Sequence, residues 1–390
     1  MEPYLPNYLK GKNRRLVFDL LRERGQMSRA EITRDTGMSF PTAMKVVDAF
    51  LEKGLLVELD ETGPAAGAGR KGRLLRFEPG AYRAVGVECE GRFARVGLAD
   101  MAGGVQARET IELGDFARTR DLSPLAAAIR RMCAAANGAP VLGVCIGFPA
   151  NLDPDAAAIV SYAAMDIQQP TSFAQVFPAF WREVELPVYL ENDANLACEG
   201  EAFLRRGAGG AANMLYLSIG SGCGGAVRLD GKLRRGARCR AGEVGAMLLQ
   251  PALGAPGRSA ARETLEDAVC LAALERRFGA ALRDGAQPGE ASAQAMRDYL
   301  CGPLSGAVYS LVMTLDVELC VLAGIVPGAL GMQLCTQVSE ALRAALPAVV
   351  SVTDQSTPVR VEPSVSADAG VIGAAATVFE RSLDALLGSG

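Results

Sequence analysis

The sequence predicts an α/β protein with a small basic N-terminal part and a larger acidic part made of two similar lobes. Two short helical segments joined by a glycine lie between Ser28 and Gly54, and a basic hairpin follows them. Residues 1–83 hold 15 Lys and Arg against 11 Asp and Glu, a net charge of +4, whereas residues 84–390 hold 25 against 33, a net charge of −8. Apolar runs of strand length then recur in two successive sets, each followed by helical segments, which is typical of a repeated α/β unit.

Capping residues mark the helical pair. Ser28 and Glu31 form a capping box, which predicts a helix over Arg29 to Thr36 that Gly37 ends. Ser39 is expected to cap a second helix. The apolar face of this second helix recurs at helical spacing and consists of Ala43, Val46, Val47, Phe50 and Leu51.

Two helices joined by a turn of this kind are typical of the helix-turn-helix, whose second helix lies in the major groove of DNA. An amphipathic segment from Asn13 to Arg24 completes a three-helix bundle. Leu55–Leu59 and Leu74–Phe77 are expected strands on either side of a Gly/Ala-rich basic loop. The outward-facing side chains of the second helix are Phe40, Thr42, Lys45 and Asp48.

These features predict a winged helix-turn-helix domain over residues 1–82 that binds duplex DNA. The basic charge of this part suits phosphate contacts, whereas the acidic remainder argues against a body that wraps nucleic acid. The alternative is a surface helical hairpin followed by a floppy basic loop. The expected DNA contacts are Ser39, Phe40, Thr42, Lys45, Arg70, Lys71 and Arg73.

Composition excludes several classes of protein. No apolar run approaches the ~18 residues that a membrane-spanning helix needs, and the N-terminus is polar, so we expect a cytoplasmic protein. The 10 cysteines are scattered without a Cys-x-x-Cys pair, which is typical of reduced, mostly buried residues. The sequence has no histidine, which removes the commonest metal ligand and the usual proton shuttle near neutral pH.

The larger part, residues 83–390, begins with three apolar strands, a helix and a fourth strand. The order β-β-β-α-β is a repeated unit of the actin-like ATPase fold, which is ribonuclease H-like. A helix over Phe173–Glu183 and a strand over Val188–Leu190 then lead into the segment from Glu191 to Asn195. The first five elements are expected at Ala84–Glu90, Phe93–Ala99, Val105–Leu113, Leu125–Cys133 and Val141–Phe148.

The second half of this part repeats the plan. We expect two strands around the glycine turn GSGCGG, helices from Thr264 onwards, two later strands and a C-terminal helix. Lobe 1 would then cover residues 83–205 and 371–390, and lobe 2 residues 206–370, with a ligand cleft between them. The strands and the last helix are expected at Asn213–Ile219, Gly225–Leu229, Val317–Leu322, Val359–Val361 and Val371–Leu387.

Taken in order, segments from most of the sequence resemble the ROK family, whose members are sugar kinases and sugar-responsive transcriptional repressors of bacteria. Family kinases lack the DNA-binding head, so its presence indicates the repressor branch. The segments that carry the resemblance are SRAEITRDTGMSFPTAMKVVDAFLEKGLL, GRKGR, GVCIGFPANLDP, PVYLENDANLACEGEAF, LYLSIGSGCGGAVRLDGKLRRGA and AGEVGAM.

The resemblance implies a sugar site. Family members use an aspartate in the ENDAN segment as the base that deprotonates a sugar hydroxyl, and that position is Asp193 in this sequence. Asn192, Glu243 in AGEVGAM and Glu266 in ETLED are implied to contact sugar hydroxyls. The alternative for Asp193 is structural, since a carboxylate between a strand and the helix Leu196–Leu204 can cap that helix.

The segment that holds ATP phosphates in the family kinases departs from their pattern. Kinases have an aspartate followed two residues later by glycine and then by threonine, whereas the equivalent stretch here runs from Glu88 to Phe93 as ECEGRF. Glu90 adds negative charge where the phosphates would lie. The adenosine-side glycine pair is reduced to Ala323-Gly324-Ile325, and Gly220–Gly225 keeps the form of a phosphate loop, although a hairpin turn of this composition needs no ligand.

The zinc ligands of the family are missing from the sequence. In relatives they are a histidine that follows the glycine of a Glu-x-Gly-His motif and three cysteines in a nearby run. Ala246 stands at the histidine position, and the run corresponds roughly to Pro256–Thr264, which holds no cysteine. We therefore expect no metal and no cofactor, and recognition of a hexose is left open because the missing histidine contacts sugar in relatives.

The sequence thus predicts a transcriptional regulator of carbohydrate metabolism: a repressor that binds operator DNA as a homodimer or higher homo-oligomer and responds to a sugar or sugar-derived ligand. The ligand would favour one spacing of the two heads. Enzyme activity is not expected, because phosphoryl transfer needs the nucleotide's phosphates held and neutralised. Two alternatives stay open: a sugar kinase with a fused DNA-binding head, and a regulator whose body is only a dimerisation scaffold.

Overall fold

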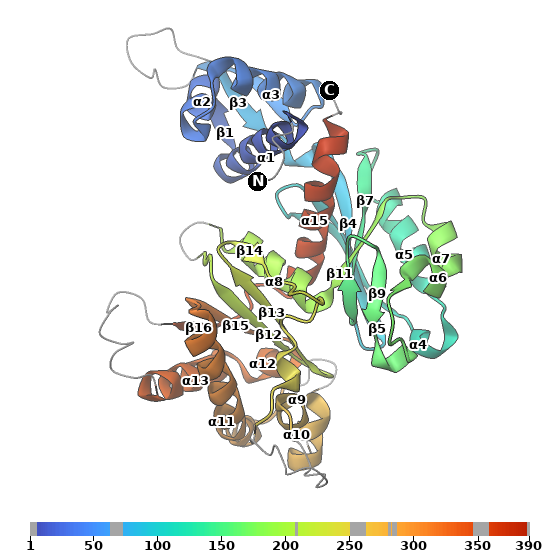
Figure 1. The fold of residues 1–390 in the computed structure, drawn as a ribbon, viewed down its shortest axis with the longest axis vertical. Coiled ribbons are helices and arrows are strands. Elements are labelled where there is room, and N and C mark those ends of the chain that lie inside the picture. Colours follow the sequence, from blue (N-terminus) through green and yellow to red (C-terminus); the bar gives the residue numbers. More distant parts are fainter. Residues whose placement is uncertain are drawn as a thin grey trace.

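The structure is a computed structural model, and it describes residues 6–62, 73–206, 210–249, 263–279, 282, 287–345 and 359–387. Figure 1 shows three parts: a head at the N-terminal end and two lobes, each built on a five-stranded sheet. Within the described residues, no helix has both the length and the apolar character needed to cross a membrane.

The head contains the predicted pair of helices and the predicted hairpin. Its three strands form an antiparallel sheet in the order β1-β3-β2. Three features differ from the prediction: the first helix begins at Pro6 rather than Asn13, β1 is an additional short strand, and the first strand of the hairpin ends at Thr62 rather than Leu59. The elements are α1 (Pro6–Arg24), β1 (Gln26–Ser28), α2 (Arg29–Thr36), α3 (Phe40–Glu52), β2 (Leu56–Thr62) and β3 (Arg73–Phe77).

Local hydrogen bonds set the ends of α2 and α3. Ser28 Oγ accepts from the Glu31 N–H at 3.3 Å, and the Glu31 carboxylate accepts from the Ser28 N–H at 2.8 Å, which confirms the capping box. Gly37, with φ of 67°, ends α2 in the left-handed conformation that favours glycine. Ser39 Oγ accepts from the Thr42 N–H at 3.4 Å and caps α3. The apolar face of α3 is buried at Ala43, Val46, Val47 and Phe50, and half-buried at Leu51.

The two lobes contain sheets of the same topology. In each sheet the first strand pairs antiparallel with the second and parallel with the fourth. This repeat is the two-lobed, actin-like plan that the sequence predicts. Lobe 1 has β4 (Arg83–Glu90), β5 (Phe93–Asp100), β6 (Val105–Glu112), β7 (Val141–Phe148) and β11 (Val188–Asn192), in the order β11-β7-β4-β5-β6. Lobe 2 has β12 (Met214–Ile219), β13 (Cys223–Leu229), β14 (Lys232–Leu233), β15 (Leu319–Ala323) and β16 (Arg360–Pro363), in the order β14-β13-β12-β15-β16.

Lobe 1 differs from the prediction at one helix. The single helix expected over 173–183 is two short helices, because Phe177 leaves the helical region with φ of −126° and ψ of 64° just before Pro178. A small antiparallel sheet in the order β10-β9-β8 lies beside these helices. The further elements of lobe 1 are η1 (Pro79–Ala81), α4 (Phe116–Thr119), α5 (Ser123–Ala134), β8 (Asn151–Asp153), β9 (Ala158–Ser161), η2 (Ala163–Met165), β10 (Thr171–Ser172), α6 (Phe173–Val176) and α7 (Pro178–Glu183).

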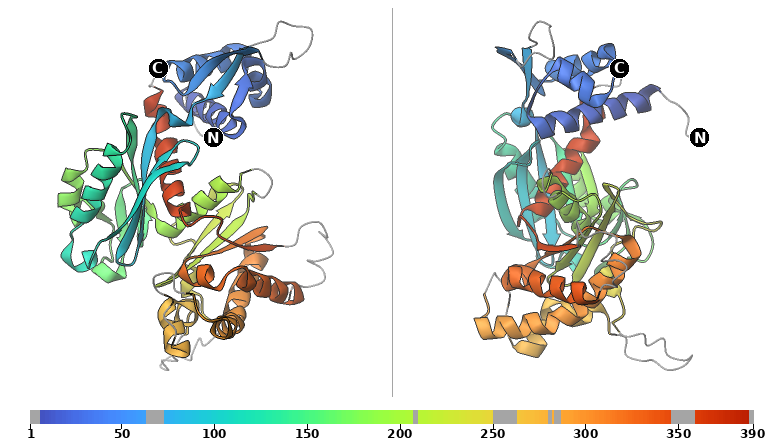
Figure 2. Two further views of the ribbon diagram at one scale, coloured as in Figure 1. Left: turned by 180° about the vertical axis from the view of Figure 1, so that it is seen from behind. Right: turned by 90° about the vertical axis from the view of Figure 1, so that its left-hand side faces the viewer.

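The helices of lobe 2 pack on one face of its sheet and share one hydrophobic core with it. The long helix α11 and the neighbouring α13 lie side by side in both views of Figure 2, where they are drawn in orange. The elements are η3 (Val244–Ala246), α9 (Leu265–Val269), α10 (Leu271–Phe278), α11 (Glu290–Leu315), α12 (Ile325–Leu330) and α13 (Met332–Ala345).

Helices α8 (Asp193–Leu204) and α15 (Ala369–Leu386) pack against each other between the lobes. Glycines bring their backbones into direct contact: a Cβ added to Gly200 would lie 1.8 Å from the Ala369 carbonyl oxygen, and one added to Gly373 would lie 1.9 Å from that of Leu196. The two helices therefore approach more closely at these glycines than any larger residue would allow.

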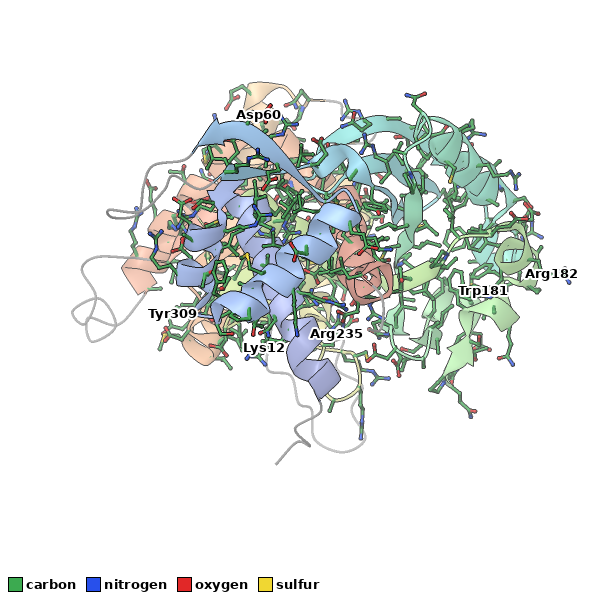
Figure 3. The ribbon with its side chains drawn as sticks, turned by 90° about the horizontal axis from the view of Figure 1, so that it is seen from above. Lys12, Asp60, Trp181, Arg182, Arg235 and Tyr309 are labelled. Atoms are coloured by element: carbon green, nitrogen blue, oxygen red, sulfur yellow. The ribbon has the colours of Figure 1, made fainter. Side chains whose placement is uncertain are left out.

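The head docks on the far end of α15. Arg15 of α1 forms an ion pair with Glu380, and Arg14 donates to the Leu387 carbonyl oxygen at 3.0 Å. One hydrophobic cluster runs from the core of the head to the buried face of α15 on the lobe 1 sheet. Figure 3 looks down on the head, with Lys12 on α1 and Asp60 on β2 labelled, and Trp181 of α7 towards the outer side of lobe 1.

Candidate functional site

A cleft of about 850 Å³ lies between the lobes. Lobe 1 contributes the end of β11 and the start of α8, and lobe 2 contributes the turn between β12 and β13 and the segment before η3. The cleft brings together the side chains that the sequence proposes for ligand binding, which are Asn192, Asp193, Glu243 and Glu266.

The capping role at the start of α8 belongs to Asn192. Its backbone is extended, with φ of −62° and ψ of 143°, and its Oδ1 accepts from the Asn195 N–H at 3.1 Å. Asp193 is the first helical residue, and its Oδ1 accepts from the Ala194 N–H at 2.9 Å. Asn192 is therefore the N-cap residue, and the Asp193 carboxylate satisfies a further N–H of the first turn, so the structural alternative for Asp193 holds in part. Asp193 also lines the cleft.

The environment of Asp193 favours the protonated acid. Desolvation raises the pKa of this carboxyl to about 7, against the stabilising backbone hydrogen bond from Ala194, and the charges of Glu88 and Glu90 act in the same direction as desolvation. A carboxyl with a pKa near neutrality can exchange a proton with a bound hydroxyl or ammonium group.

Glu243 and Glu266 reach the cleft from lobe 2. The Asn151 amide, oriented as its neighbours require, donates to Glu243 Oε1 at 2.6 Å and accepts from Ser161 Oγ at 3.1 Å. Desolvation raises the pKa of Glu243. Glu266 Oε2 accepts from the Cys223 N–H at 2.8 Å, so this carboxylate holds the start of β13 in place.

The glycine segment GSGCGG is a tight hairpin turn. Cys223, Gly224 and Gly225 already belong to β13 and pair with β12, and the Gly220 N–H donates to the Gly222 carbonyl at 2.9 Å. A Cβ on Gly222 would lie 2.9 Å from Glu266 Oε2, and a Cβ on Gly220 would lie 2.8 Å from Glu90 Oε1. The glycines thus give two carboxylates room beside the turn.

The end of β4 adds negative charge to the cleft. Glu88 and Glu90 both line it, and Arg95 Nη2 lies 3.1 Å from Glu88 Oε2 and 3.4 Å from Glu90 Oε2. Desolvation raises the pKa of Glu88. Arg92 forms a surface ion pair of 2.8 Å with Glu112 and is not among the residues that line the cleft.

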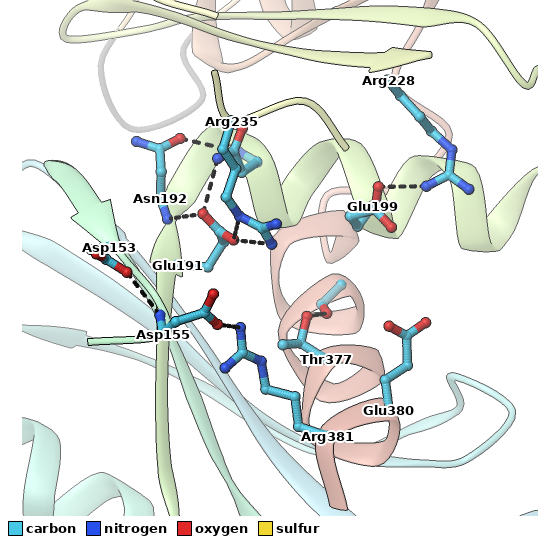
Figure 4. A network of polar contacts seen from close by, with 12 residues as sticks. Asp153, Asp155, Glu191, Asn192, Glu199, Arg228, Arg235, Thr377, Glu380 and Arg381 are labelled. Atoms are coloured by element: carbon cyan, nitrogen blue, oxygen red, sulfur yellow. Dashed lines mark hydrogen bonds and ion pairs between the residues drawn. The ribbon is translucent and has the colours of Figure 1, made fainter. Parts of the chain in front are cut away.

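An ion pair between a buried carboxylate and a partly exposed arginine joins the two lobes next to the cleft (Figure 4). Glu191 is 2% exposed, and Arg235 of lobe 2 contacts its Oε2 through Nη2 at 2.6 Å and Nε at 2.7 Å. Glu191 also accepts from the Asn192 N–H at 3.0 Å and from Asn195 Nδ2 at 2.9 Å. The sequence carried no sign of this pair, since its members lie on different lobes.

Sequence reasoning also missed Asn151, Asp166 and Asn195 as cleft residues. Asn195 stands in the same ENDAN segment as Asp193, so its place on the first turn of the helix was the available signal. Asn151 and Asp166 lie on lobe 1 segments whose approach to the cleft depends on the packing of the small sheet β8–β10.

The head presents a second candidate surface along α3. Phe40 is 57% exposed at the start of the helix, and Lys45 is exposed one turn later. The hydroxyls of Ser39 and Thr42 lie 2.8 Å apart and hydrogen-bond to each other. Arg73 begins β3 and pairs with Glu58 at 3.2 Å. Arg70 and Lys71, the other expected DNA contacts, lie outside the described residues.

Comparison with known proteins places these features in a family. The ROK family model matches residues 84–381. The chain is 27% identical over 241 residues to a xylose repressor of Caldicellulosiruptor bescii, a match that covers 61% of this chain and 58% of that protein. It is 34% identical over 141 residues to a glucokinase of Halalkalibacterium halodurans, covering 34% of this chain and 40% of that one.

One solved structure has the same overall arrangement. It is a ROK family transcriptional regulator described as a homolog of the E. coli MLC protein, and it aligns with a TM-score of 0.75 and 17% identity, covering 97% of this chain and 98% of that one. This likeness concerns the fold, including the head. From the match of the family model across both lobes, the chain belongs to the ROK family.

Proposed function

We propose that the protein is a transcriptional repressor whose affinity for operator DNA is controlled by a sugar-like ligand in the interlobe cleft. The head supports DNA binding, because α3, the second helix of the helix-turn-helix pair, exposes side chains of the kind that enter the major groove. The proposed partner places the protein in the same compartment as chromosomal DNA. The names of the xylose repressors among its relatives favour the same function.

One observation carries this proposal: α8 connects the cleft to the head. The helix begins at Asp193 in the cleft, and near its other end the Phe203 ring lies 4.9 Å from the guanidinium carbon of Arg22 in α1. Lobe closure around a ligand would shift α8, and with it the surface on which the head rests. In a homodimer, this shift would change the distance between two heads on a two-fold operator.

A sugar kinase is the second candidate, and two observations favour it. Asp193 stands at the position of the family base, with a pKa of about 7, and a glucokinase is among the relatives. The charge beside the glycine turn opposes it, because Glu90 lies there and Arg95, the neighbouring cation, is already paired with Glu90 and Glu88. ATP phosphates need donors and cations at such a turn. We therefore propose that the cleft senses a ligand without phosphorylating it.

The test starts with selection of duplexes from a random pool by the full-length protein, followed by titration of the selected duplex with a panel of sugars. We expect a preferred two-fold sequence and a sugar that changes its affinity. Asp193→Asn should weaken the response to the sugar and leave DNA affinity intact, whereas Asp230→Asn, an exposed carboxyl on lobe 2, serves as the matched control.

Two further results would decide between the candidates. Sugar-dependent release of ADP from ATP that Asp193→Ala abolishes would establish the kinase. Failure to select any sequence from the pool would refute the repressor. Phe203→Leu should keep both binding activities and reduce the effect of the sugar on DNA affinity, because it removes the contact between α8 and Arg22.

A further inference from the structure

The residues that line the cleft include many more acidic than basic side chains. Among the described residues, Arg240 is the one lining cation, and its side chain is exposed to solvent. Arg95 is not among the residues that line the cleft, and it forms ion pairs with both Glu88 and Glu90. The carboxylates that line the cleft are Glu88, Glu90, Asp166, Asp193, Glu243 and Glu266.

Several of these carboxylates are held by neutral donors rather than by cations. Asp193 accepts from the Ala194 N–H at 2.9 Å, and Glu266 from the Cys223 N–H at 2.8 Å. Asp166 Oδ1 accepts from the Gln168 side-chain amide, Nε2, at 2.9 Å. Neutral N–H groups position a carboxylate but supply no balancing positive charge. Desolvation raises the pKa of Asp193, Glu88 and Glu243, so a cation bound beside these groups would favour their ionised forms and be attracted by them.

An unsatisfied buried amide oxygen gives independent evidence about the ligand. Asn195 lines the cleft and is 6% exposed. Its Nδ2 donates to Glu191 Oε1 at 2.9 Å, whereas its Oδ1 has no hydrogen-bond partner in the described part of the chain. A buried acceptor without a donor is costly, so a ligand that brings a donor to this position would stabilise the complex.

The charges of the cleft and its hydrogen-bonding groups indicate the same kind of ligand. The carboxylates and Asn195 Oδ1 are all acceptors, so the complementary ligand is rich in donors and positively charged. An ammonium group brings three N–H donors and no acceptor, whereas a hydroxyl brings one donor. No cluster of Asp, Glu or Cys among the described residues could hold a metal ion, so donors spread over an extended molecule fit these acceptors better than a single small ion.

We propose that the effector is a cationic polyhydroxylated molecule, an amino sugar with a free ammonium group, rather than a neutral sugar. This inference rests on the proposed function, since it names the chemical class of the ligand in the same cleft. The hydroxyls of such a ligand would bond the carboxylates of lobe 2, and its ammonium group would lie among those at the end of β4 and the start of α8.

The test is isothermal titration of the full-length protein with matched ligands: glucosamine, glucose and N-acetylglucosamine, and the corresponding galactose series. At about pH 6.5 a primary amine on such a ring is protonated. We expect each amino sugar to bind about tenfold or more tightly than its neutral parent and its acetylated form, the effect of one charge-assisted hydrogen bond in a partly desolvated site. Binding should also release protons, because a cation beside Asp193 lowers its pKa.

Variants identify the charge that is responsible. Glu90→Gln should reduce the preference for the amino sugar over its neutral parent, whereas Glu112→Gln, an exposed carboxyl outside the cleft lining, should leave it unchanged. A neutral parent that binds as tightly as its amino sugar would overturn the inference and leave the sugar-responsive repressor standing. Absence of binding by every sugar would overturn both this inference and the proposed sugar-responsive function. Competition between Mg²⁺ alone and the amino sugar for the cleft would indicate an inorganic cation instead.

Discussion

The glycines between α8 and α15 allow a quantitative prediction. Replacing Gly200 by Ala puts a Cβ 1.8 Å from the Ala369 carbonyl oxygen, and Cβ contacts below 3.0 Å are essentially never found, so the two helices must separate by about 1.2 Å. Both atoms in conflict belong to helix backbones or are fixed to them, which leaves no flexible side chain to move aside. We therefore expect a cost near the upper end of the ~1–3 kcal/mol typical of overpacked cores.

Gly200→Ala also has a favourable effect on the free energy of unfolding, and a control variant measures that effect alone. Alanine stabilises a helix interior by about 1 kcal/mol relative to glycine. Gly306 lies inside α11, and a Cβ added to it meets nothing within 4 Å, so Gly306→Ala should show this gain alone. The net effect of Gly200→Ala should be a loss of about 2 kcal/mol, and the two variants should differ by about 3 kcal/mol.

Thermal unfolding followed by circular dichroism measures this difference. In large domains each kcal/mol moves Tm by about 2 °C or slightly more, so Gly200→Ala should melt at least about 4 °C below the parent and Gly306→Ala at or above it. Equal melting temperatures for Gly200→Ala and the parent would refute the backbone contact between α8 and α15.

Three other predictions concern the cleft and the head. Asp193 binds its proton more tightly in the folded chain, with a pKa of about 7 against 3.8, so its stabilising contribution is complete below 3.8 and is lost as pH rises through 7. As pH rises across this interval, the Tm of the parent should fall relative to that of Asp193→Asn, and above it the difference in Tm should stay constant. Asp230→Asn should show no such trend relative to the parent. Phe40 is exposed where α3 would meet base edges, so it could contact thymine methyl groups. Replacing operator thymines by uracil removes these methyl groups and should weaken DNA binding by the parent more than by Phe40→Ala, as measured by fluorescence anisotropy. Equal reductions in affinity would exclude Phe40 from methyl recognition. Replacing Arg70 and Lys71 by Ala should weaken binding to all duplexes and flatten its dependence on salt by roughly one unit of slope for each phosphate that is no longer neutralised, and an unchanged slope would show that neither residue binds phosphate.

Features that depend on neighbouring residues could be predicted from the sequence, with most ends of helices and strands within about two residues of those in the structure. The capping box at Ser28 and the left-handed Gly37 determine the ends of α2 by themselves. The central strands of both lobes are continuous apolar runs that can be recognised in the sequence. The start of α1 could not be located, because its first turns hold Lys10, Gly11 and Lys12 and show no apolar repeat.

Features that depend on distant partners could not be predicted in the same way. Strand β1 exists because Met27 pairs with Leu75 of β3, on the other side of the helix pair. The sequence placed Asp193 and Glu243 in one site through family resemblance, and the structure brings both to the cleft. The Glu191–Arg235 pair and the unsatisfied Asn195 oxygen depend on how the lobes meet, for which no local pattern exists.

The position of α15 has a consequence for the order in which the protein acquires its structure during translation. The head needs residues only as far as β3 and can fold while the lobes are still being synthesised, since domains generally fold as units from the N-terminus. Helix α15 covers the lobe 1 sheet and carries the docking site of the head, yet it is synthesised after every strand of both lobes. A nascent chain would thus present a folded head with no fixed orientation to the body, and the two would become coupled only when this last helix leaves the ribosome.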